Sequence, residues 1–462
     1  MSSVGSEVVR IVSTCTIKPQ CIIEETQEEF NLTPWDLSFL SAEPIQKGLL
    51  FAKTPSLSDH ENPMNSMIKI IEQLKNSLSL TLSHFYPLCG HLSTRKQDDP
   101  PSYTVFLDCS DSQGAEFIYA IAENVTVADI LNPLNVPPIV RSFFALNGSK
   151  NHDGHTQPLL AVQVTELVDG YFIGCSFNHV VGDGTSFWHF FSTWAEICRT
   201  KGNVESISTV PPITERWFSE EEQQQEDYAG FNLPFSHHDE FIERTIASPP
   251  LSKRIFHFSA QSIAQLKTKA NSEACTNKIS SLQALSALVW RSVTRVLGVH
   301  EEQETACRLL VNDRLRLNPP LSIDYFGCSA GSVAGIAKSG ELLGHELGWA
   351  AWLLHEAVAS RTDDKVRQWL NNWLKNPSFL PVRRVHGQTM VSIGSSPRFD
   401  MYGCEFGWGK AIAVRSGSSV NYSGNVWLYP GREGGGSVDL ELCLPQETMS
   451  ALESDEEFTS SH

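Results

Sequence analysis

Hydrophobic and polar residues alternate along Leu160–Leu167, which is the pattern of a strand with one buried face. The triplet Val168-Asp169-Gly170 then predicts a hairpin turn, and a more apolar run predicts a second strand over 171–180. His179 therefore lies where a buried strand ends. Because a strand end holds a side chain in a fixed direction, this position suits a general base.

A break and a helix follow this pair of strands. Gly182-Asp183-Gly184 interrupts the apolar run, and aromatic residues at helical spacing predict a helix over 185–199. Asp183 then lies beside the start of the helix, four residues after His179. The local sequence allows two interpretations: a catalytic His with a nearby carboxylate, or a hydrogen-bonded core His beside a helix-capping Asp.

Other periodic segments predict helices and strands along the rest of the chain. Apolar residues recur at helical spacing from Ile68 to Phe85, and again after the N-cap pair Ser280-Ser281. Residues 139–146 predict a strand, and residues 342–374 predict helices. The acidic stretch 453–457 predicts a frayed C-terminal tail.

Periodicity disappears between Thr200 and about Pro250. Residues 220–227 are all acidic or glutamine, and prolines recur through the segment. Such a composition marks a connection between compact units. We therefore expect a first domain over 1–200, a crossover loop over 201–250 and a second domain over 251–462.

Composition narrows the class of protein. The chain has 462 residues, of which 41% are hydrophobic and 19% charged, as in a globular protein of two or three domains. No apolar run reaches about 18 residues, so no membrane span is expected, and the first residues do not resemble a signal peptide. The net charge of −18 argues against nucleic acid and anionic membrane as partners.

The cysteines and histidines suggest a reducing compartment and no metal. The eleven cysteines are scattered and never form Cys-x-x-Cys, which favours free thiols and a cytoplasmic protein. His152 and His155 lie in a polar loop with no possible ligand nearby except Asp153. They therefore predict solvated surface, and no metal site is expected.

Two motifs far apart in the chain carry a family resemblance. The first is His179-x-x-x-Asp183-Gly184, and the second is Cys404-Glu405-Phe406-Gly407-Trp408-Gly409. This pair resembles the signature of the plant BAHD acyl-CoA-dependent acyltransferases, which read His-x-x-x-Asp-Gly and Asp-Phe-Gly-Trp-Gly. The segments Asn312-Asp313-Arg314-Leu315-Arg316 and Tyr325-Phe326-Gly327-Cys328 are similar to that family's pattern as well.

The resemblance covers nearly the whole chain and implies both a fold and an activity. The implied fold is α/β, with two chloramphenicol-acetyltransferase-like domains, each a mixed β-sheet flanked by helices, and an active-site channel between them. The implied activity is acyl transfer from acyl-CoA to a hydroxyl or amine of a plant metabolite. Acyl-CoA is then a co-substrate, no cofactor is permanently bound, the acceptor is a small molecule and the protein is a monomer.

The same resemblance names the catalytic candidates. His179 is the general base, and a neutral imidazole suits that role near pH 7. Glu405 joins His179 as a catalytic candidate through the second motif. In the family, however, that motif lies away from the His and supports the fold and the coenzyme channel.

A structural role is implied for the residues around the His. Asp183 could orient His179 as in a triad, but the resemblance favours a carboxylate that turns away from the substrate. We expect it to pair with Arg314, or failing that Arg316, across the site. The residues expected to be structural at the site are Asp183, Gly184, Arg314 and Trp408.

A groove for coenzyme A is expected in the C-terminal half. Free N–H groups at the helix start after Ser280 suit a phosphate, and this role is compatible with capping. The residues assigned to the groove are Ser280, Ser281, Arg314, Arg316, Ser395, Ser396 and Arg398.

Several positions depart from the family pattern. Glu405 replaces the usual Asp, which moves the carboxylate by about an angstrom, and Cys328 replaces the usual Asn. Gly394 and Ser396 stand where many members have a Thr and a Trp, so the oxyanion contact is left to Ser395, Ser396 or a backbone N–H. These departures leave two alternatives open: a small-molecule-binding protein with a degenerate site, and a same-fold lyase that does not use coenzyme A.

Overall fold

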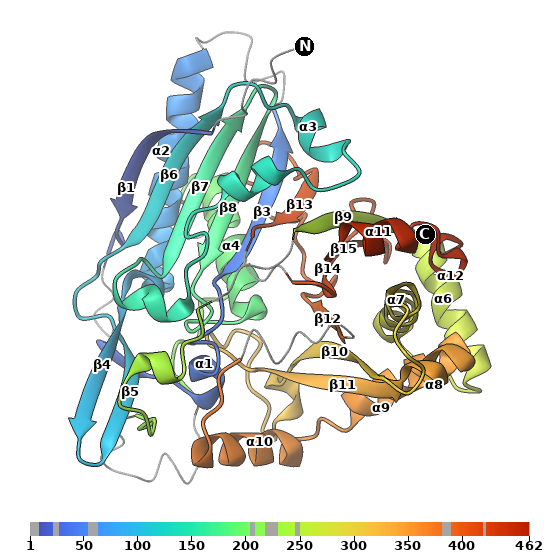
Figure 1. Ribbon diagram of the computed structural model, residues 1–462. Coiled ribbons are helices and arrows are strands. Elements are labelled where there is room, and N and C mark those ends of the chain that lie inside the picture. The colour runs from blue at the N-terminus through green and yellow to red at the C-terminus, as the bar shows by residue number, and fades with distance from the viewer. Residues whose placement is uncertain are drawn as a thin grey trace.

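Two six-stranded sheets organise the molecule, and a three-stranded sheet completes it (Figure 1). The structure is a computed structural model that describes residues 9–21, 27–53, 63–203, 208–217, 230–244, 250–380, 390–418 and 422–461. The whole acidic and glutamine-rich stretch 220–227, like the rest of 218–229, lies outside these residues. Both large sheets are mixed, because β6 and β7 pair in parallel in one, and β10–β12 and β12–β14 in the other. The expected α/β architecture is therefore present.

The first sheet carries the predicted strand pair at its centre. Its strands, in spatial order, are β1 (Arg10–Ile17), β6 (Ala115–Ala122), β7 (Leu160–Leu167), β8 (Gly170–Phe177), β3 (Ile45–Ala52) and β13 (Ala413–Ser416). Helices α2 (Pro63–His84) and α4 (Gly184–Arg199) pack on one face of this sheet, and their apolar side chains join the largest core. The small sheet beside it consists of β2 (Glu29–Asn31), β5 (Pro101–Asp108) and β4 (His91–Asp98).

The second sheet has a core of its own. Its strands, in spatial order, are β11 (Ala330–Lys338), β10 (Glu304–Asn312), β12 (Met390–Gly394), β14 (Asn425–Pro430), β15 (Val438–Pro445) and β9 (Leu251–Phe258). Buried residues of three helices pack against it: α6 (Ala260–Glu273), α7 (Ser281–Leu297) and α9 (Leu347–Ala359). The other helices of the described residues are α1 (Pro34–Leu37), α3 (Val127–Leu131), α8 (Ser339–Gly344), α10 (Asp363–Lys375), α11 (Gln446–Leu452) and α12 (Glu456–Thr459). The same residues contain 3-10 turns at Tyr86–Cys89, Pro138–Phe143, Asn151–His155, His238–Glu240 and Arg314–Arg316.

One strand crosses from the C-terminal part of the chain into the first sheet. β13 pairs antiparallel with β3, so that Ala413 lies opposite Leu50. The segment just before β13 follows it, and Phe406 and Trp408 pack in the core of the first sheet. No local pattern in the sequence predicts this crossing, which joins the two halves through main-chain hydrogen bonds.

Local signals placed the functional helices correctly. Asp183 is the N-cap of α4, because its Oδ1 accepts from the N–H groups of Thr185 (3.0 Å) and Ser186 (3.1 Å). Ser280 caps α7 in a capping box with Gln283. These caps satisfy N–H groups that a helix start otherwise leaves without partners.

The strand predicted over 139–146 is wrong. Residues Pro138–Phe143 form a 3-10 turn, because Pro138 at its start fixes a helical φ angle and the turn lies across the face of the first sheet. The carbonyl of Phe143 comes so close to Gly174 of β8 that a Cβ at Gly174 would clash with it. An apolar run can mark such a packed turn as readily as a strand.

Two surface predictions are also wrong. His152 is buried and His155 half-buried, since Asn151–His155 folds under the segment that holds 235–241. The acidic C-terminal stretch is ordered rather than frayed, because Asp455 and Glu457 form ion pairs with Arg295 of α7. In both places the partners come from distant segments of the chain, so the local sequence does not predict them.

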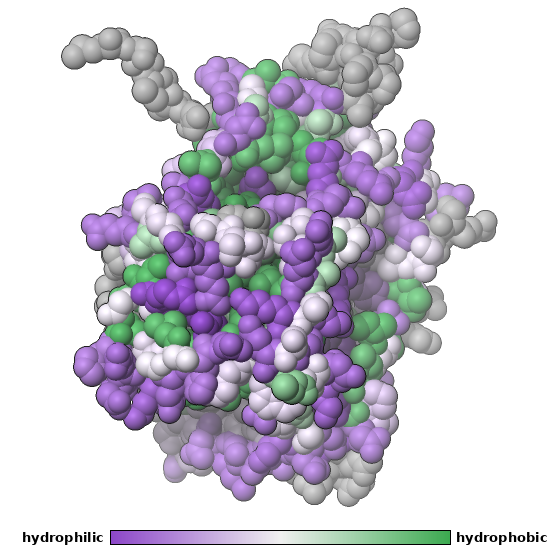
Figure 2. Space-filling view, turned by 90° about the vertical axis from the view of Figure 1, so that its right-hand side faces the viewer, coloured by the Kyte–Doolittle hydropathy of each residue, from purple (hydrophilic) through white to green (hydrophobic). Residues whose placement is uncertain are grey.

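The outside of the molecule matches the acidic, polar composition. Hydrophilic residues cover most of the face in Figure 2, with smaller hydrophobic areas between them. No helix in the described ranges has the length and apolar character needed to cross a membrane.

Candidate active site

His179 lies in the short connection between β8 and α4, and three other segments hold it there. Its N–H donates to Oδ1 of Asn151 (2.8 Å), and its imidazole stacks on the ring of Phe39 with centroids 3.7 Å apart and planes 8° apart. The thiol of Cys328 donates to the carbonyl of His179 (2.9 Å) and lies 3.8 Å from Nδ1. The ring therefore has a fixed orientation.

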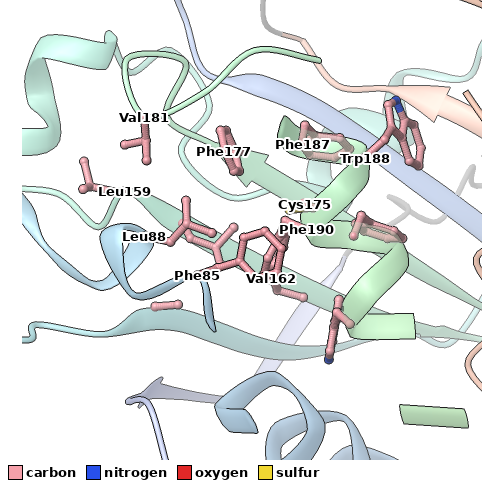
Figure 3. Packing of buried hydrophobic residues seen from close by; sticks show 14 of the residues in the cluster. Phe85, Leu88, Leu159, Val162, Cys175, Phe177, Val181, Phe187, Trp188 and Phe190 are labelled. Atoms are coloured by element: carbon pink, nitrogen blue, oxygen red, sulfur yellow. The ribbon is translucent and has the colours of Figure 1, made fainter. Parts of the chain in front are cut away.

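The strand end and helix start that carry His179 rest on a packed aromatic layer. Phe177 of β8 contacts Phe187 of α4 edge to face at 5.7 Å, and Phe190 lies one turn further along the helix (Figure 3). All three side chains are completely buried. Because close-packed aromatic rings resist displacement, the main chain around His179 cannot shift without disturbing the core.

The environment of His179 favours its neutral form. Burial lowers the pKa of His179 below its ordinary value of 6.5. Hydrogen bonds to the backbone carbonyls of His179 and Gly182, and the carboxylates of Asp183 and Asp36, oppose this effect without cancelling it. At neutral pH the imidazole therefore holds a free lone pair, as a base must.

Asp183 forms the expected ion pair with Arg314. Its carboxylate accepts from Nη1 (2.6 Å) and Nη2 (3.1 Å) of Arg314, and also from the N–H of Ser329 (3.0 Å). Burial alone would raise the pKa of Asp183, but Arg314 and the N–H donors outweigh burial and lower it. Since these partners take up both oxygens, Asp183 makes no hydrogen bond to the ring of His179, and the predicted pairing is confirmed.

His179 and Asp183 line a cavity of about 1340 Å³. Its wall draws on both halves of the molecule, from the α4 start and the segment after α1 to β10 and β11. Segments 235–243, 377–380 and 395–400 complete it. A volume this large exceeds that of most small-molecule sites, so two ligands can occupy it together.

The candidate residues fall into two groups. Besides His179 and Asp183, those that line the cavity are Gly184, Ser395, Ser396 and Arg398. The cavity wall does not include Ser280, Ser281, Arg314, Arg316, Glu405 or Trp408. Arg314 is completely buried on Asp183, and Arg316 donates to the carbonyls of Val358 (3.0 Å) and Arg361 (2.7 Å).

The second motif lies in the core rather than on the cavity. Phe406 is completely buried against Trp194 (4.8 Å between centroids) and Phe191 (5.7 Å), and Trp408 packs beside it. Glu405 is half-buried, and within the described ranges its carboxylate makes no hydrogen bond or ion pair. This segment therefore joins the chain before β13 to the first sheet.

Local sequence reasoning missed three residues that shape the site. Asn151 joins the segment after α1 to the His179 turn, since its Nδ2 donates to the carbonyl of Phe39 (2.9 Å) while its Oδ1 accepts from His179. Phe39 covers one face of the imidazole. Arg308 of β10 is half-buried and lines the cavity, and no carboxylate of the described residues pairs with it. No local signal marks Asn151 or Phe39, whereas a charged residue in the otherwise apolar run 307–311 was a clue to Arg308.

The segment 394–396, where many family members have a Thr and a Trp, has an unusual backbone. Gly394 has no room for a Cβ, because the ring of Trp427 occupies that space. The next residue, Ser395, has φ +63°, a conformation that non-glycine residues seldom adopt. Ser395 and Ser396 both face the cavity, so the strained turn presents its polar groups there.

Comparison with known proteins agrees with this geometry. The Transferase family profile matches residues 8–459. An uncharacterised acetyltransferase of Arabidopsis thaliana is 36% identical over 97% of this chain and 98% of its own, and the BAHD acyltransferase DCR of the same plant is 34% identical over 97% and 92%. The crystal structure of TRI101 from F. sporotrichioides, complexed with coenzyme A and T-2, superposes with a TM-score of 0.71 at 17% identity, over 94% of this chain and 99% of TRI101. The chain thus belongs to the Transferase family, among the plant BAHD acyltransferases.

Proposed function

We propose that this protein transfers an acyl group from acyl-CoA to a hydroxyl or amine of a small plant metabolite, with His179 as the general base. The observation that carries the proposal is a neutral imidazole, held by Phe39 and Cys328, on the wall of a cavity large enough for donor and acceptor. Family membership supplies the reaction class. Asp183, Gly184, Arg314 and Trp408 then act through structure rather than by contact with the reacting atoms.

The reaction needs few groups from the protein. As the acceptor oxygen or nitrogen attacks the thioester carbonyl, its proton passes to the ring nitrogen of His179 that faces the cavity. Since Nδ1 lies beside Cys328, that nitrogen is Nε2. The tetrahedral intermediate then collapses, the C–S bond breaks, and the thiolate of coenzyme A takes the proton back from His179.

The oxyanion contact is assigned to the 395–396 turn. Ser395 and Ser396 face the same cavity as His179, and their hydroxyl and N–H groups are possible donors to an oxyanion. Gly394 supplies no hydroxyl of its own. The lack of a hydroxyl at position 394 favours a second candidate function: a same-fold lyase or binding protein that does not use coenzyme A.

Two arginines suit the phosphates of coenzyme A. Arg308 and Arg398 both line the cavity, and no carboxylate of the described chain pairs with either. An unpaired guanidinium on a cavity wall binds a phosphate through paired N–H groups. With Ser395 and Ser396 they form the proposed groove, whereas Arg314 and Arg316 are committed to protein acceptors and Ser280 caps α7. The structure of TRI101 with coenzyme A supports a groove in this fold.

The acceptor is proposed to lie against an aromatic wall. Phe39 covers the imidazole, and Phe241 and Phe379 stack on each other at 4.7 Å on the same cavity. Apolar rings favour a small, largely apolar acceptor over a highly charged one. Either a hydroxyl or an amine can deliver its proton to His179.

Glu405 contributes, on this proposal, through the packing of Phe406 and Trp408. A domain division at 201–250 and a monomeric, cytoplasmic enzyme complete the proposal. All eleven cysteines are free, which supports a reducing compartment. Size-exclusion chromatography with light scattering tests the monomer.

Binding of coenzyme A tests the proposal most directly. Titration calorimetry should show saturable binding to the wild-type chain, and Arg308→Ala should weaken it at least about tenfold, since it removes a charge-assisted contact. Arg10→Ala is the matched control, because Arg10 is an exposed arginine paired with Glu123. The affinity of this variant for coenzyme A should equal that of the wild type. A wild-type chain that does not bind coenzyme A would favour the lyase or binding protein.

A screen for activity identifies the substrates. The purified chain is incubated with a set of acyl-CoA donors and a plant metabolite extract, and new acylated products are read by mass spectrometry. His179→Ala in parallel separates enzymatic products from background acylation. Products that form equally with both proteins would contradict the proposed role of His179.

A further inference from the structure

Cys328 stands where the resembling family has Asn, and it touches the proposed base directly. Its Sγ lies 2.9 Å from the carbonyl oxygen and 3.8 Å from Nδ1 of His179. We infer that Cys328 is a positioning residue: its thiol holds the main chain of His179 and closes the Nδ1 edge of the ring, so that Nε2 faces the cavity. The catalytic meaning of this inference rests on the proposed function, whereas the contact between Cys328 and His179 does not depend on that function.

Cys328 can position another residue because it is itself held rigidly. Its N–H donates to Oδ1 of Asp36 (2.9 Å), and the N–H of the next residue, Ser329, donates to Oδ2 of Asp183 (3.0 Å). The carbonyl before it, on Gly327, accepts from Nη2 of Arg314 (2.9 Å). Two buried carboxylates and one buried guanidinium thus fix this stretch of backbone on both sides of the thiol.

Two contacts confine the ring of His179, and a third holds its main chain. Phe39 lies parallel to one face at 3.7 Å, Asn151 holds the N–H of the same residue, and Cys328 fills the space at Nδ1. Each contact comes from a different part of the chain. Removal of either ring contact leaves the ring free to turn in that direction, which moves Nε2 away from the reacting proton.

The geometry excludes Cys328 as a nucleophile. The side chain is completely buried and does not line the cavity, so a thioester cannot reach it. Burial, with smaller contributions from Asp36 and Asp183, raises the pKa of the thiol well above its ordinary value. The thiol therefore keeps its proton, which it donates to the carbonyl of His179, and no acyl-cysteine forms.

A thiol in place of an amide has a consequence for protonation of the base. Burial is the largest cause of the lowered pKa of His179. A thiol is a weak donor with little polarity, so it fills the space at Nδ1 without stabilising an imidazolium. Cys328→Ala leaves a gap that admits water or lets the ring turn, and the pKa of His179 then rises toward its ordinary value.

The first experiment measures the protonation of His179 without any assay of activity. The full chain is labelled with ¹³C in the histidine rings, and the His179 signal is assigned by its loss in His179→Gln. We expect the pKa of His179 to rise by about half a pH unit or more in Cys328→Ala. Cys307→Ala, which removes a buried thiol 3.9 Å from the carbonyl of Ser286 in the other core, is the control and should leave it unchanged.

The second experiment reads the effect on turnover. In Cys328→Ala we expect kcat to fall about tenfold with little change in KM for acyl-CoA, and the acid limb of the pH profile to move upward with the pKa. Cys328→Ser keeps a donor for the His179 carbonyl and should retain most of the activity. Because the serine is nearly isosteric, it also covers the case in which Cys328→Ala fails to fold.

Three outcomes would overturn the inference. The first is a His179 titration unchanged in both Cys328 variants, and the second is unchanged turnover in a folded Cys328→Ala protein. The third is acylated Cys328 in the mass spectrum after incubation with acyl-CoA. Failure of the proposed function looks different: the wild-type chain then transfers no acyl group, while the titration of His179 still responds to Cys328→Ala.

Discussion

The two motifs that reveal the family occupy opposite kinds of place in the molecule. The turn that carries His179 and Asp183 lies on the cavity wall, whereas Phe406 and Trp408 of the second motif lie in the core of the first sheet. A signature in sequence therefore identifies the family without saying what its residues do. Position separates the two motifs: the first lies where the proposed base can meet its substrates, and the second attaches the chain before β13 to the opposite half.

Asp183 lines the cavity, and its carboxylate is also buried against Arg314. Its loss should therefore have the largest effect. Asp183→Asn leaves the buried Arg314 without its carboxylate, which should cost about 3–5 kcal/mol of unfolding free energy and lower activity too. Urea unfolding and steady-state kinetics on one preparation measure both quantities. Asp363→Asn, at a half-exposed pair with Arg367 on α10, is the control and should cost at most about 1 kcal/mol.

The pH dependence of this loss has a defined sign. Since the folded pKa of Asp183 lies below its ordinary value of 3.8, the carboxylate stabilises the fold above that value. The stabilisation is lost as pH falls through the folded pKa. The difference between wild type and Asp183→Asn should therefore be full at neutral pH and shrink below pH 3.8, and a constant difference would contradict the ion-pair explanation.

Phe406→Ala should separate the core motif from the cavity motif. It removes a completely buried ring and should cost about 3–5 kcal/mol of stability, while the folded fraction keeps activity within a few-fold. Phe399→Ala is the matched variant, because Phe399 is a half-buried ring on the cavity wall. Phe399→Ala should lower stability less than Phe406→Ala does, and it should lower activity more. The reverse ranking would break the comparison between the two motifs.

His179→Ala should change activity alone. Loss of the base should lower turnover at least about 10²-fold, with a nearly unchanged melting temperature. Because its pKa is lowered, the wild-type rate should stay flat as pH falls through 6.5 and decline only at lower pH. His300→Ala, at an exposed surface position, is the control. Full activity in His179→Ala would refute the mechanism.

Glu405→Gln should have the smallest effect. Within the described ranges its carboxylate has no partner and it does not line the cavity, so stability should change by less than about 0.5 kcal/mol and turnover by less than about twofold. Glu405→Asp, which restores the residue usual in the family, should be equally mild. A tenfold loss in Glu405→Gln would instead place Glu405 in the catalytic machinery and move the second motif toward the site.

Elements with local signals could be predicted from the sequence. Period-two alternation gave β7, aromatic residues at helical spacing gave α4, and the caps Asp183 and Ser280 marked helix starts. Such signals lie within a dozen residues, because helix capping and the burial of one face of an element depend on residues close in sequence. The Asp183–Arg314 pair is the exception, since it came from the family resemblance and not from spacing.

The contacts between distant segments depend on the complete fold. The pairing of β13 with β3, the bond from His179 to Asn151 and the contact of Cys328 with Nδ1 each join residues more than 25 positions apart. The burial of His152 and the ordered acidic end have the same origin. Strand order and the packing of whole layers fix these contacts, and no pattern within a single segment encodes them, because the free energy that selects them is shared by the entire core.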